Sequence, residues 1–429
     1  IARSMNVSMK KMIYDRLTGR ETSLAVIGLG YVGVPVALRF ARCFDVVGYD
    51  MDARRIEKLR EKYGAGCGSI RFTSLEEELS RAAFYIVTVL TPVDERKNPD
   101  LTCLVEATRT VARYLKRGDY VVYESTVYPG CTEEVCVPLL EKGSGLKLGA
   151  DFKVGYSPER INPNDSEHTF SNTAKIVSAN DGQALDEVAR VYAEVVAADL
   201  CRASGIRVAE AAKMTENVQR SVNIALMNEL QRLFSRMGID MGEVIDMASS
   251  KWNFVKYRPG LGGGHCIPVD PLYLVSAASK LGVEMPVTSS GCAVNDGMAA
   301  YVVRSLLGAM GSDGRGARAL LMGVTYKENI DDIRNSRIAE MVGLLEREGM
   351  SVDVTDPHAD PDKVYAMYGI RPVPALRPPY DLIVVAVAHD EYRGLDDAYF
   401  RSISRGAALL GDIRGLYKGR IKSLGYWSL

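Results

Sequence analysis

Apolar residues in the first half of the chain occur in short runs that are separated by longer amphipathic stretches. Apolar runs lie at 24–27, 46–50, 84–89, 120–123 and 153–156, and the helical patterns between them include 33–41 and 104–115. Short apolar strands that alternate with helices are typical of a parallel sheet with crossover helices. We therefore predict that residues 1–205 form one doubly wound α/β domain.

The second half begins with an amphipathic pattern of a different kind. Residues 206–237 form a helical pattern without internal Gly or Pro, and further helical patterns follow at 271–281 and 286–310 after a loop. The long helix is suited to join two lobes. It is also too apolar for full exposure, which predicts pairing with a second copy in a homodimer. Residues 206–312 are therefore expected to form a central helical domain.

The tail returns to the alternation of strands and helices seen at the start. Strand patterns lie at 319–323, 351–354 and 382–387, and a helical pattern lies at 338–348. A second, smaller α/β domain over residues 313–429 is the prediction.

Composition excludes several classes of protein. The 429 residues include 53 Lys and Arg against 54 Asp and Glu, so the totals support no basic field for nucleic acid or an anionic membrane. The eight cysteines show no CxxC spacing, which favours a reducing cytoplasm over a disulfide framework. No apolar run approaches the roughly 20 residues of a membrane span, and the start lacks the apolar core of a signal peptide.

A glycine-rich turn predicts a dinucleotide site. Gly28, Gly30 and Gly33 lie between a strand and a helix, where missing β-carbons allow phosphate to approach the helix N-terminus. Asp50 ends the next strand, where a carboxylate can accept hydrogen bonds from ribose hydroxyls and repel a 2′-phosphate. NAD is therefore favoured over NADP, although Arg54 and Arg55 lie close by. The alternative is a turn that merely packs a helix on a sheet.

A second glycine-rich loop carries a cysteine. Gly262, Gly263 and Gly264 precede His265 and Cys266, and Asp270 with Pro271 predicts an N-cap and first turn of a helix. A cysteine just ahead of a helix N-terminus is favoured as thiolate, although a lone cysteine is more often a small buried apolar residue. With four histidines and no second ligand pair at metal spacing, we expect no metal.

Four other polar positions are candidates for chemistry. Lys213 and Asn217 lie one helical turn apart on one face and could together bind an oxyanion, although an isolated lysine is more often solvated. Thr126 and Glu159 each follow a predicted strand, at the edge where α/β sheets bind ligands. The alternative for Glu159 is an ion pair with Arg160.

Together these motifs resemble the UDP-glucose/GDP-mannose dehydrogenase family, in order and over essentially the whole chain. The matching segments are 26–33, 125–127, 156–160, Lys213 with Asn217, 263–266 and 327–334. The resemblance implies a four-electron oxidation of a sugar C6 alcohol to a uronate, with two NAD reduced per sugar. It implies that Cys266 forms a thiohemiacetal and then a thioester with the substrate.

The resemblance also assigns roles to other residues. The implied catalytic set is Cys266, Lys213, Asn217, Asp270, Glu159 and Thr126, with Glu159 as the base that activates water. The implied cofactor contacts are Gly28, Gly30, Tyr31, Val32, Gly33, Asp50, Arg55, Thr91, Thr126 and Lys327. The implied substrate contacts are Glu159, Arg160, Lys213, Asn217, Arg258, Gly263, Lys327 and Arg334.

Residues 157–163, with 167–168 and 258–261, resemble the subgroup that oxidises UDP-N-acetylglucosamine or UDP-N-acetylgalactosamine for surface polysaccharides. The chain departs from that subgroup at Asn164, Gly262 and Pro268. UDP-glucose and UDP-N-acetylmannosamine are the alternatives within the family. Outside it, a two-electron β-hydroxyacid dehydrogenase and a non-catalytic sugar-nucleotide binder are the competing classes.

Overall fold

The computed structural model describes residues 11–429 except 65–67, 161–166 and 168. The chain divides into two compact units, Ile1–Glu216 and Asn217–Leu429, which are taken in turn. No helix among the described residues is long and apolar enough to cross a membrane. The predicted α/β class is confirmed, whereas the predicted domain boundaries at 205 and 312 stay a prediction.

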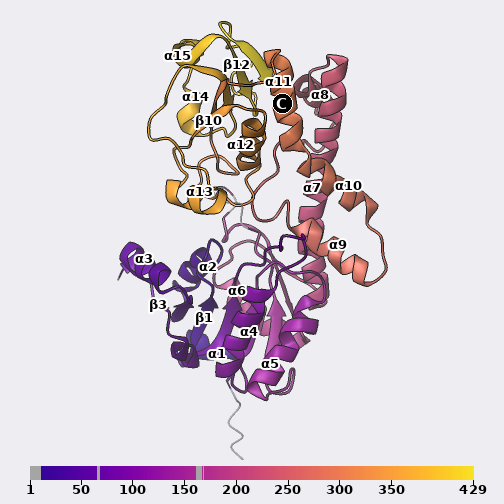
Figure 1. Cartoon of the computed structure of the whole chain (residues 1–429). Coiled ribbons are helices and arrows are strands. Elements are labelled where there is room, and N and C mark those ends of the chain that lie inside the picture. Colours follow the sequence, from indigo (N-terminus) through magenta and orange to yellow (C-terminus); the bar gives the residue numbers. More distant parts are fainter. Residues whose placement is uncertain (1–10, 65–67, 161–166, 168) are drawn as a thin grey trace, which may run out of the picture. The chain divides into compact units, whose positions relative to one another are not determined.

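The first unit contains an eight-stranded sheet in the order β3-β2-β1-β4-β5-β6-β7-β8 (Figure 1). All neighbouring strands are parallel except β6 and β7. The strands are β1 (Ser23–Ile27), β2 (Val46–Tyr49), β3 (Ile70–Thr73), β4 (Ala82–Val87), β5 (Tyr120–Tyr123), β6 (Lys153–Tyr156), β7 (Lys175–Ala179) and β8 (Leu200–Arg202). The helices are α1 (Ile13–Thr18), α2 (Gly33–Phe40), α3 (Ala53–Tyr63), α4 (Thr102–Tyr114), α5 (Val137–Ser144) and α6 (Gly182–Ala193).

Helices cover both faces of this sheet, which explains why its central strands are unbroken apolar runs. Phe84 of β4 shares a core with residues of α2 and α6. The next residue, Tyr85, donates its hydroxyl to the carbonyl of Tyr114 at the end of α4. Successive side chains of a strand point to opposite faces, so α4 lies on the face opposite α2 and α6. The sequence pattern predicted this arrangement.

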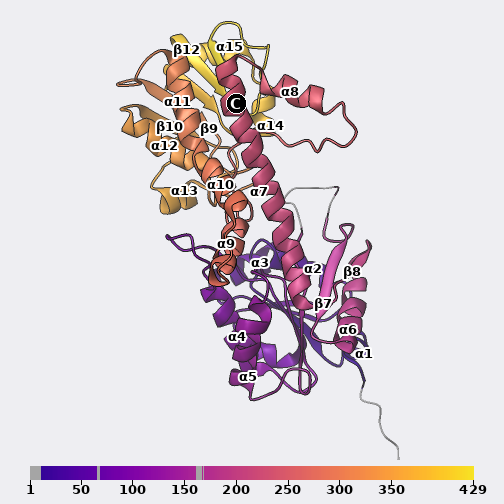
Figure 2. The ribbon, with the colours of Figure 1, turned by 90° about the vertical axis from the view of Figure 1, so that its right-hand side faces the viewer.

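Helix α7 (Ile206–Met237) has the predicted bounds, and the boundary between the two units falls within it. The other helices that precede the C-terminal sheet are α8 (Met241–Ala248), α9 (Asp270–Lys280), α10 (Pro286–Asp296) and α11 (Met298–Met310), all labelled in Figure 2.

The single helix predicted over 286–310 is wrong, because α10 ends at Asp296, Gly297 follows it, and α11 begins at Met298. Glycine is a poor helix former. Just before Gly297, the buried side chain of Asn295 donates from Nδ2 to the Ser221 carbonyl of α7, and its Oδ1 accepts from Asn228 Nδ2. These bonds tie the end of α10 to α7.

The C-terminal sheet has five parallel strands in the order β10-β9-β11-β12-β13. They are β9 (Arg318–Met322), β10 (Ser351–Thr355), β11 (Tyr380–Val385), β12 (Ser404–Asp412) and β13 (Gly425–Ser428). The helices are α12 (Arg337–Arg347), α13 (Pro361–Tyr368), α14 (Asp390–Arg393) and α15 (Asp397–Ile403). Helix α11 contributes Val302 and Leu306 to the core of this sheet.

Candidate active site

In the glycine turn after β1, one glycine has room for a side chain and two do not. Gly28 has φ +91°, and a β-carbon there would lie 2.7 Å from Val89 Cγ1. A β-carbon on Gly33 would lie 1.9 Å from the Gly28 carbonyl oxygen, so Gly33 is required by close packing. A β-carbon on Gly30 would meet nothing within 4 Å. Gly30 is therefore the position at which a ligand can approach the backbone.

Asp50, directly after β2, completes this turn. Its Oδ2 accepts from the Leu29 amide at 2.8 Å and from Arg55 Nη1 at 2.8 Å. Thr91, after β4, is 1% exposed, and its Oγ1 has no hydrogen-bond partner among the residues that the structure describes. A buried carboxylate that ends β2 and an unpartnered hydroxyl after β4 fit a dinucleotide bound along the carboxyl ends of the strands.

The other predicted cofactor contacts of the first unit lie on the same edge of the sheet. Tyr31 is 42% exposed, and Val32 is the N-cap of α2. Thr126 follows β5, which is hydrogen-bonded to β4. Because β1, β4 and β5 are successive neighbours in the sheet, these residues follow the carboxyl ends of nearby strands.

Glu159 lies in the loop after β6 and is 9% exposed. Its Oε1 accepts from the Arg160 amide at 2.6 Å, and its Oε2 lies 3.6 Å from Lys175 Nζ. The Arg160 guanidinium instead pairs with Glu216 at 2.6 Å. The alternative of a Glu159–Arg160 side-chain pair is therefore wrong.

Lys213 is 7% exposed, so the alternative of a solvated surface lysine is wrong. Its Nζ donates to the backbone carbonyl of Glu159 at 2.8 Å. A buried ammonium that binds the backbone of a carboxylate-bearing loop orients that loop. The structure thus brings Lys213 and Glu159 together.

In the second unit, the side chains of Asn217 and Asp270 form a buried hydrogen-bonded pair. Asn217 Nδ2 donates to Asp270 Oδ2 at 2.5 Å, and the two side chains are 5% and 0% exposed. The predicted N-cap role of Asp270 is wrong. Asp270 is the first residue of α9, Val269 is the N-cap, and no side chain caps the helix. The carboxylate is directed to Asn217 instead of to the helix amides.

The cysteine loop rests on residues 326–335. A β-carbon on Gly263 would lie 2.9 Å from Tyr326 Cβ, and one on Gly264, whose φ is +82°, would lie 2.7 Å from the Tyr326 ring. The Gly264 amide donates to the Arg334 carbonyl at 3.2 Å, and Asn335 Nδ2 donates to the Gly264 carbonyl at 3.0 Å. Two motifs that are distant in the sequence are thus held together.

Cys266 is half-buried, and its carbonyl accepts from the Asp270 amide at 2.9 Å. The thiol-bearing residue therefore sits one turn ahead of α9, as predicted, where amide dipoles favour negative charge. Hydrogen bonding to Asp332 raises the pKa of Arg334, and the charges of Asp332, Tyr326 and Cys266 add to it. Arg334 is thus a fixed cation in the electrostatic environment of Cys266.

For the remaining predicted contacts, the structure gives only their local partners. The Lys327 carbonyl accepts from Thr325 Oγ1 at 3.0 Å. Arg258 is about half exposed and pairs with Asp246 of α8 at 3.3 Å. The subgroup residues Ile161, Asn162, Pro163, Asn164 and His168 lie outside the described residues.

Sequence reasoning missed Glu124 and Lys175, although a charged residue within or beside a buried strand was a signal that could have found them.

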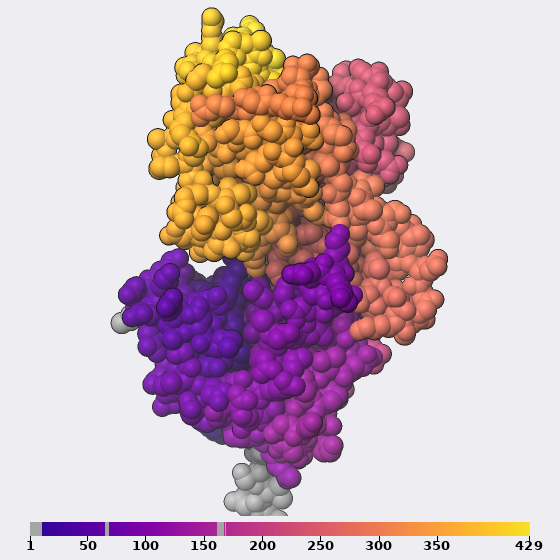
Figure 3. Space-filling view, viewed as in Figure 1, coloured from indigo at the N-terminus to yellow at the C-terminus, as the bar shows by residue number. Residues whose placement is uncertain are grey.

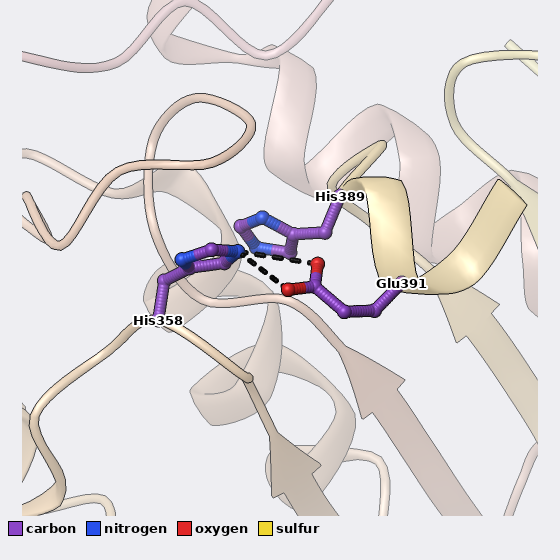
Figure 4. A group of neighbouring side chains, drawn as sticks. All are labelled: His358, His389 and Glu391. Carbon is purple, nitrogen blue, oxygen red and sulfur yellow. Dashed lines mark hydrogen bonds and ion pairs between the residues drawn. The ribbon is translucent and has the colours of Figure 1, made fainter. Parts of the chain in front are cut away.

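His358, His389 and Glu391 gather after β10 and β11 (Figure 4). His389 Nδ1 accepts from the Asn329 amide at 2.9 Å, so a neutral ring carries its proton on Nε2, which lies 3.2 Å from Asp356 Oδ2. That tautomer leaves Nε2 without a lone pair for a metal. The trio therefore fits a hydrogen-bonded network better than a metal site.

Three regions match domain profiles of one family. They are the NAD binding domain (22–196), the central domain (207–297) and the UDP binding domain (320–419) of the UDP-glucose/GDP-mannose dehydrogenase family. The chain is 44% identical to a UDP-N-acetyl-D-glucosamine 6-dehydrogenase of Pseudomonas aeruginosa, over 92% of this chain and 97% of that one. A Salmonella typhi protein of the same name is 43% identical, over 92% and 96%. The solved UDP-D-ManNAc dehydrogenase of Pyrococcus horikoshii superposes with a TM-score of 0.85 at 29% identity, over 94% and 98%.

Proposed function

The chain belongs to the UDP-glucose/GDP-mannose dehydrogenase family, and from that premise we propose that it oxidises C6 of a UDP-N-acetylhexosamine of the gluco or galacto type. It is an NAD-dependent UDP-sugar 6-dehydrogenase, and its product is a uronate. The N-acetylglucosamine relatives, at 44% and 43% identity over 92% of the chain, support the choice of sugar. UDP-glucose and UDP-N-acetylmannosamine are the alternatives within the family.

The observation that carries the chemical proposal is the position of Cys266. Gly263 and Gly264 fit against Tyr326 with no room for a side chain, which fixes the loop that bears the thiol. The thiol lies ahead of α9 and within the electrostatic influence of Arg334. Both features favour the thiolate, which is the nucleophilic form.

For the cofactor, we propose contacts from Gly28, Gly30, Tyr31, Val32 and Gly33. A second set of contacts follows other strands of the first unit and comprises Asp50, Arg55, Thr91 and Thr126. The last proposed contact is Lys327 of the second unit. Bound NAD supplies the hydride acceptor in both oxidation steps, with two NAD reduced per sugar. The Asp50 carboxylate repels a 2′-phosphate, which favours NAD over NADP.

In the first step, the C6 hydroxyl gives its proton to Asp270, directly or through water, while the Lys213 ammonium stabilises the oxygen and the C6 hydrogen leaves as hydride. Cys266 then forms a C–S bond to the resulting aldehyde, whose oxygen takes up a proton. Loss of a second hydride from C6, together with loss of the hydroxyl proton, leaves a thioester. Covalent capture keeps the aldehyde in the site and makes C6 a better hydride donor.

Water completes the reaction. Glu159 takes a proton from water while the oxygen attacks the thioester carbon, and the C–S bond breaks to return the Cys266 thiolate. Thr126 helps to position that water. The oxyanion formed during attack is stabilised by Lys213 and Asn217.

We propose that the nucleotide end of the substrate is held by cations. Arg334 offers a planar guanidinium suited to two hydrogen bonds with a phosphate, and Lys327 offers an ammonium. Both belong to the region that matches the UDP binding domain. Arg160, Arg258 and Gly263 are the further proposed contacts to the sugar nucleotide.

A homodimer is the proposed assembly. On α7, Leu226, Leu233 and Met237 are 49%, 52% and 58% exposed. In the adjoining segment, Met247, Trp252 and Val255 are 66%, 92% and 68% exposed, and this segment forms the rose-coloured surface of the second unit in Figure 3. An apolar surface of this kind marks a protein–protein contact. Sedimentation that yields only monomer at micromolar concentration would refute the proposal.

Counting NADH tests the reaction. With UDP-N-acetylglucosamine, we expect two NADH per sugar and a product of uronate mass, and a panel of UDP-sugars ranks the alternatives. One NADH per substrate would instead indicate a two-electron β-hydroxyacid dehydrogenase. Binding of the nucleotide sugar without NADH, even at high enzyme concentration, would indicate a non-catalytic binder.

The covalent route has its own test. Cys266→Ala removes the sulfur and should abolish uronate formation while NAD and UDP-sugar still bind, as measured by calorimetry. Cys266→Ser is expected to stall as a stable adduct, visible in the mass of the intact protein. Wild-type uronate production by Cys266→Ala would rule out the thioester.

A further inference from the structure

Lys175, the first residue of β7, is a lysine whose side chain is 4% exposed. Its Nζ lies 3.1 Å from Glu124 Oε2 and 3.6 Å from Glu159 Oε2, and it donates to the Pro158 carbonyl at 3.2 Å. Burial of a charge is costly unless it is paired and hydrogen-bonded. Here one ammonium is shared between two carboxylates.

Aromatic rings complete the surroundings of this ammonium. The Phe170 and Tyr192 ring centroids lie 5.0 and 5.6 Å from Lys175 Nζ. Tyr192 also donates its hydroxyl to Glu124 Oε1, so the Glu124 carboxylate is held on both oxygens. The Lys175 ammonium is therefore enclosed by two carboxylates, one carbonyl and two rings.

The two carboxylates differ in their surroundings. The Glu124 side chain is 0% exposed, and burial raises its pKa to about 7, with the nearby charge of Glu159 raising it and that of Lys175 lowering it. Glu159 is held at its Oε1 by the Arg160 amide and at its carbonyl by Lys213. Lys175 provides the third restraint, at Oε2.

We propose that Lys175 is a positioning residue for Glu159, which it keeps oriented, and that Glu124 holds Lys175 in place. This inference rests on the proposed function, in which Glu159 is the base that activates water for hydrolysis of the thioester. Glu124 lies closer to the ammonium than Glu159 does, so it competes for the same positive charge.

The geometry predicts the effects of two substitutions. Lys175→Met removes the cation next to Glu159 Oε2, so kcat falls and the acid limb of the kcat–pH profile moves up. Glu124→Gln weakens the hold on the Lys175 ammonium, so kcat falls and thioester accumulates, but by less than in Lys175→Met. The titratable groups that face Lys175 are Glu124 after β5, Glu159 after β6 and Tyr192 of α6. Lys213 of α7 faces the Glu159 carbonyl.

A control comes from a similar pair in the same sheet. Lys153, at the start of β6, pairs with Asp181 at 2.6 Å and is 18% exposed. Lys153→Met removes a lysine–carboxylate pair of the first unit that does not contact Glu159. We expect its kcat–pH profile to match that of the wild type.

The experiment measures kcat against pH with NAD and UDP-N-acetylglucosamine for the full-length variants. Acid-quenched samples are weighed as intact protein to detect the thioester on Cys266. Lys175→Met should lower kcat by roughly 10–100-fold and accumulate thioester, since general-base catalysis of this kind contributes about that much or more. Lys175→Arg should restore part of the rate. Circular dichroism melting identifies variants that have lost the fold.

The outcomes separate the inference from the proposed function. If Glu159→Gln stalls at the thioester while Lys175→Met keeps a wild-type profile, the inference fails and the function stands. If Glu159→Gln turns over normally, the base assignment fails and the inference fails with it. If Lys175→Met does not fold, Glu124→Gln decides, because wild-type kcat without accumulated thioester in that isosteric variant overturns the inference.

Discussion

The cysteine loop packs closely on Tyr326 at Gly264. We expect that adding a single methyl group there lowers the catalytic rate far more than it lowers the stability of the fold. Gly264→Ala places a β-carbon 2.7 Å from the Tyr326 ring, at a residue whose φ is +82°. The backbone conformation alone costs about 1–2 kcal/mol for a residue other than glycine. The ring contact falls about 0.7 Å short of an ordinary 3.4 Å van der Waals contact, so the loop or the ring must move by that distance.

A displacement of this size matters for a covalent nucleophile two residues away. Misplacement of a reacting group by about 1 Å can cost roughly 100-fold in rate, so we expect kcat to fall by about 10- to 100-fold. The backbone conformation should lower the free energy of unfolding by about 1–2 kcal/mol. NAD affinity should change little, because all proposed cofactor contacts except Lys327 belong to the first unit.

The control lies in the same loop. A β-carbon on Gly262 would have Ile267 Cγ2 as its nearest neighbour, at an ordinary 3.6 Å. Steady-state kinetics with UDP-N-acetylglucosamine, NAD titrations and thermal melting should be compared for Gly262→Ala and Gly264→Ala. Wild-type kcat in Gly264→Ala, or an equal loss in Gly262→Ala, would refute the reasoning.

Two further predictions concern the first unit. Gly30→Val fills space that is open in the protein, so calorimetry should show NAD affinity reduced by roughly tenfold or more, with little change in Tm. Gly33→Ala should instead lower Tm, because its β-carbon clashes with the Gly28 carbonyl. Equal effects of the two substitutions would contradict the assigned roles. Burial raises the pKa of Asp119 from 3.8 to about 6. Between those pH values the folded state binds more protons, so stability should fall by about 2 kcal/mol as pH rises from 4 to 6. Asp119→Asn should remove this contribution from the slope in denaturant titrations, and an unchanged slope would show that another group causes it.

Much of the fold follows from the amino-acid sequence by itself. The alternation of apolar runs and amphipathic stretches predicted most strands of the two sheets but missed β3, β7, β8, β12 and β13. The absence of internal Gly and Pro predicted α7 with its observed bounds. The glycine turn and Asp50 predicted the nucleotide-binding edge of the first sheet. These features are local, because the period of a strand or helix and the conformational freedom of glycine depend on neighbours in the sequence.

Only the tertiary structure decided the partners of the charged groups. Lys213 is buried against the Glu159 carbonyl, and the Asp270 carboxylate meets Asn217 instead of capping α9. Lys175 lies between two carboxylates that are 16 and 51 residues away in the sequence. Each partner comes from a different strand or helix, and the cost of burying a charge depends on which groups the fold places around it. Sequence periodicity indicates which residues are buried, but the fold determines which of them meet.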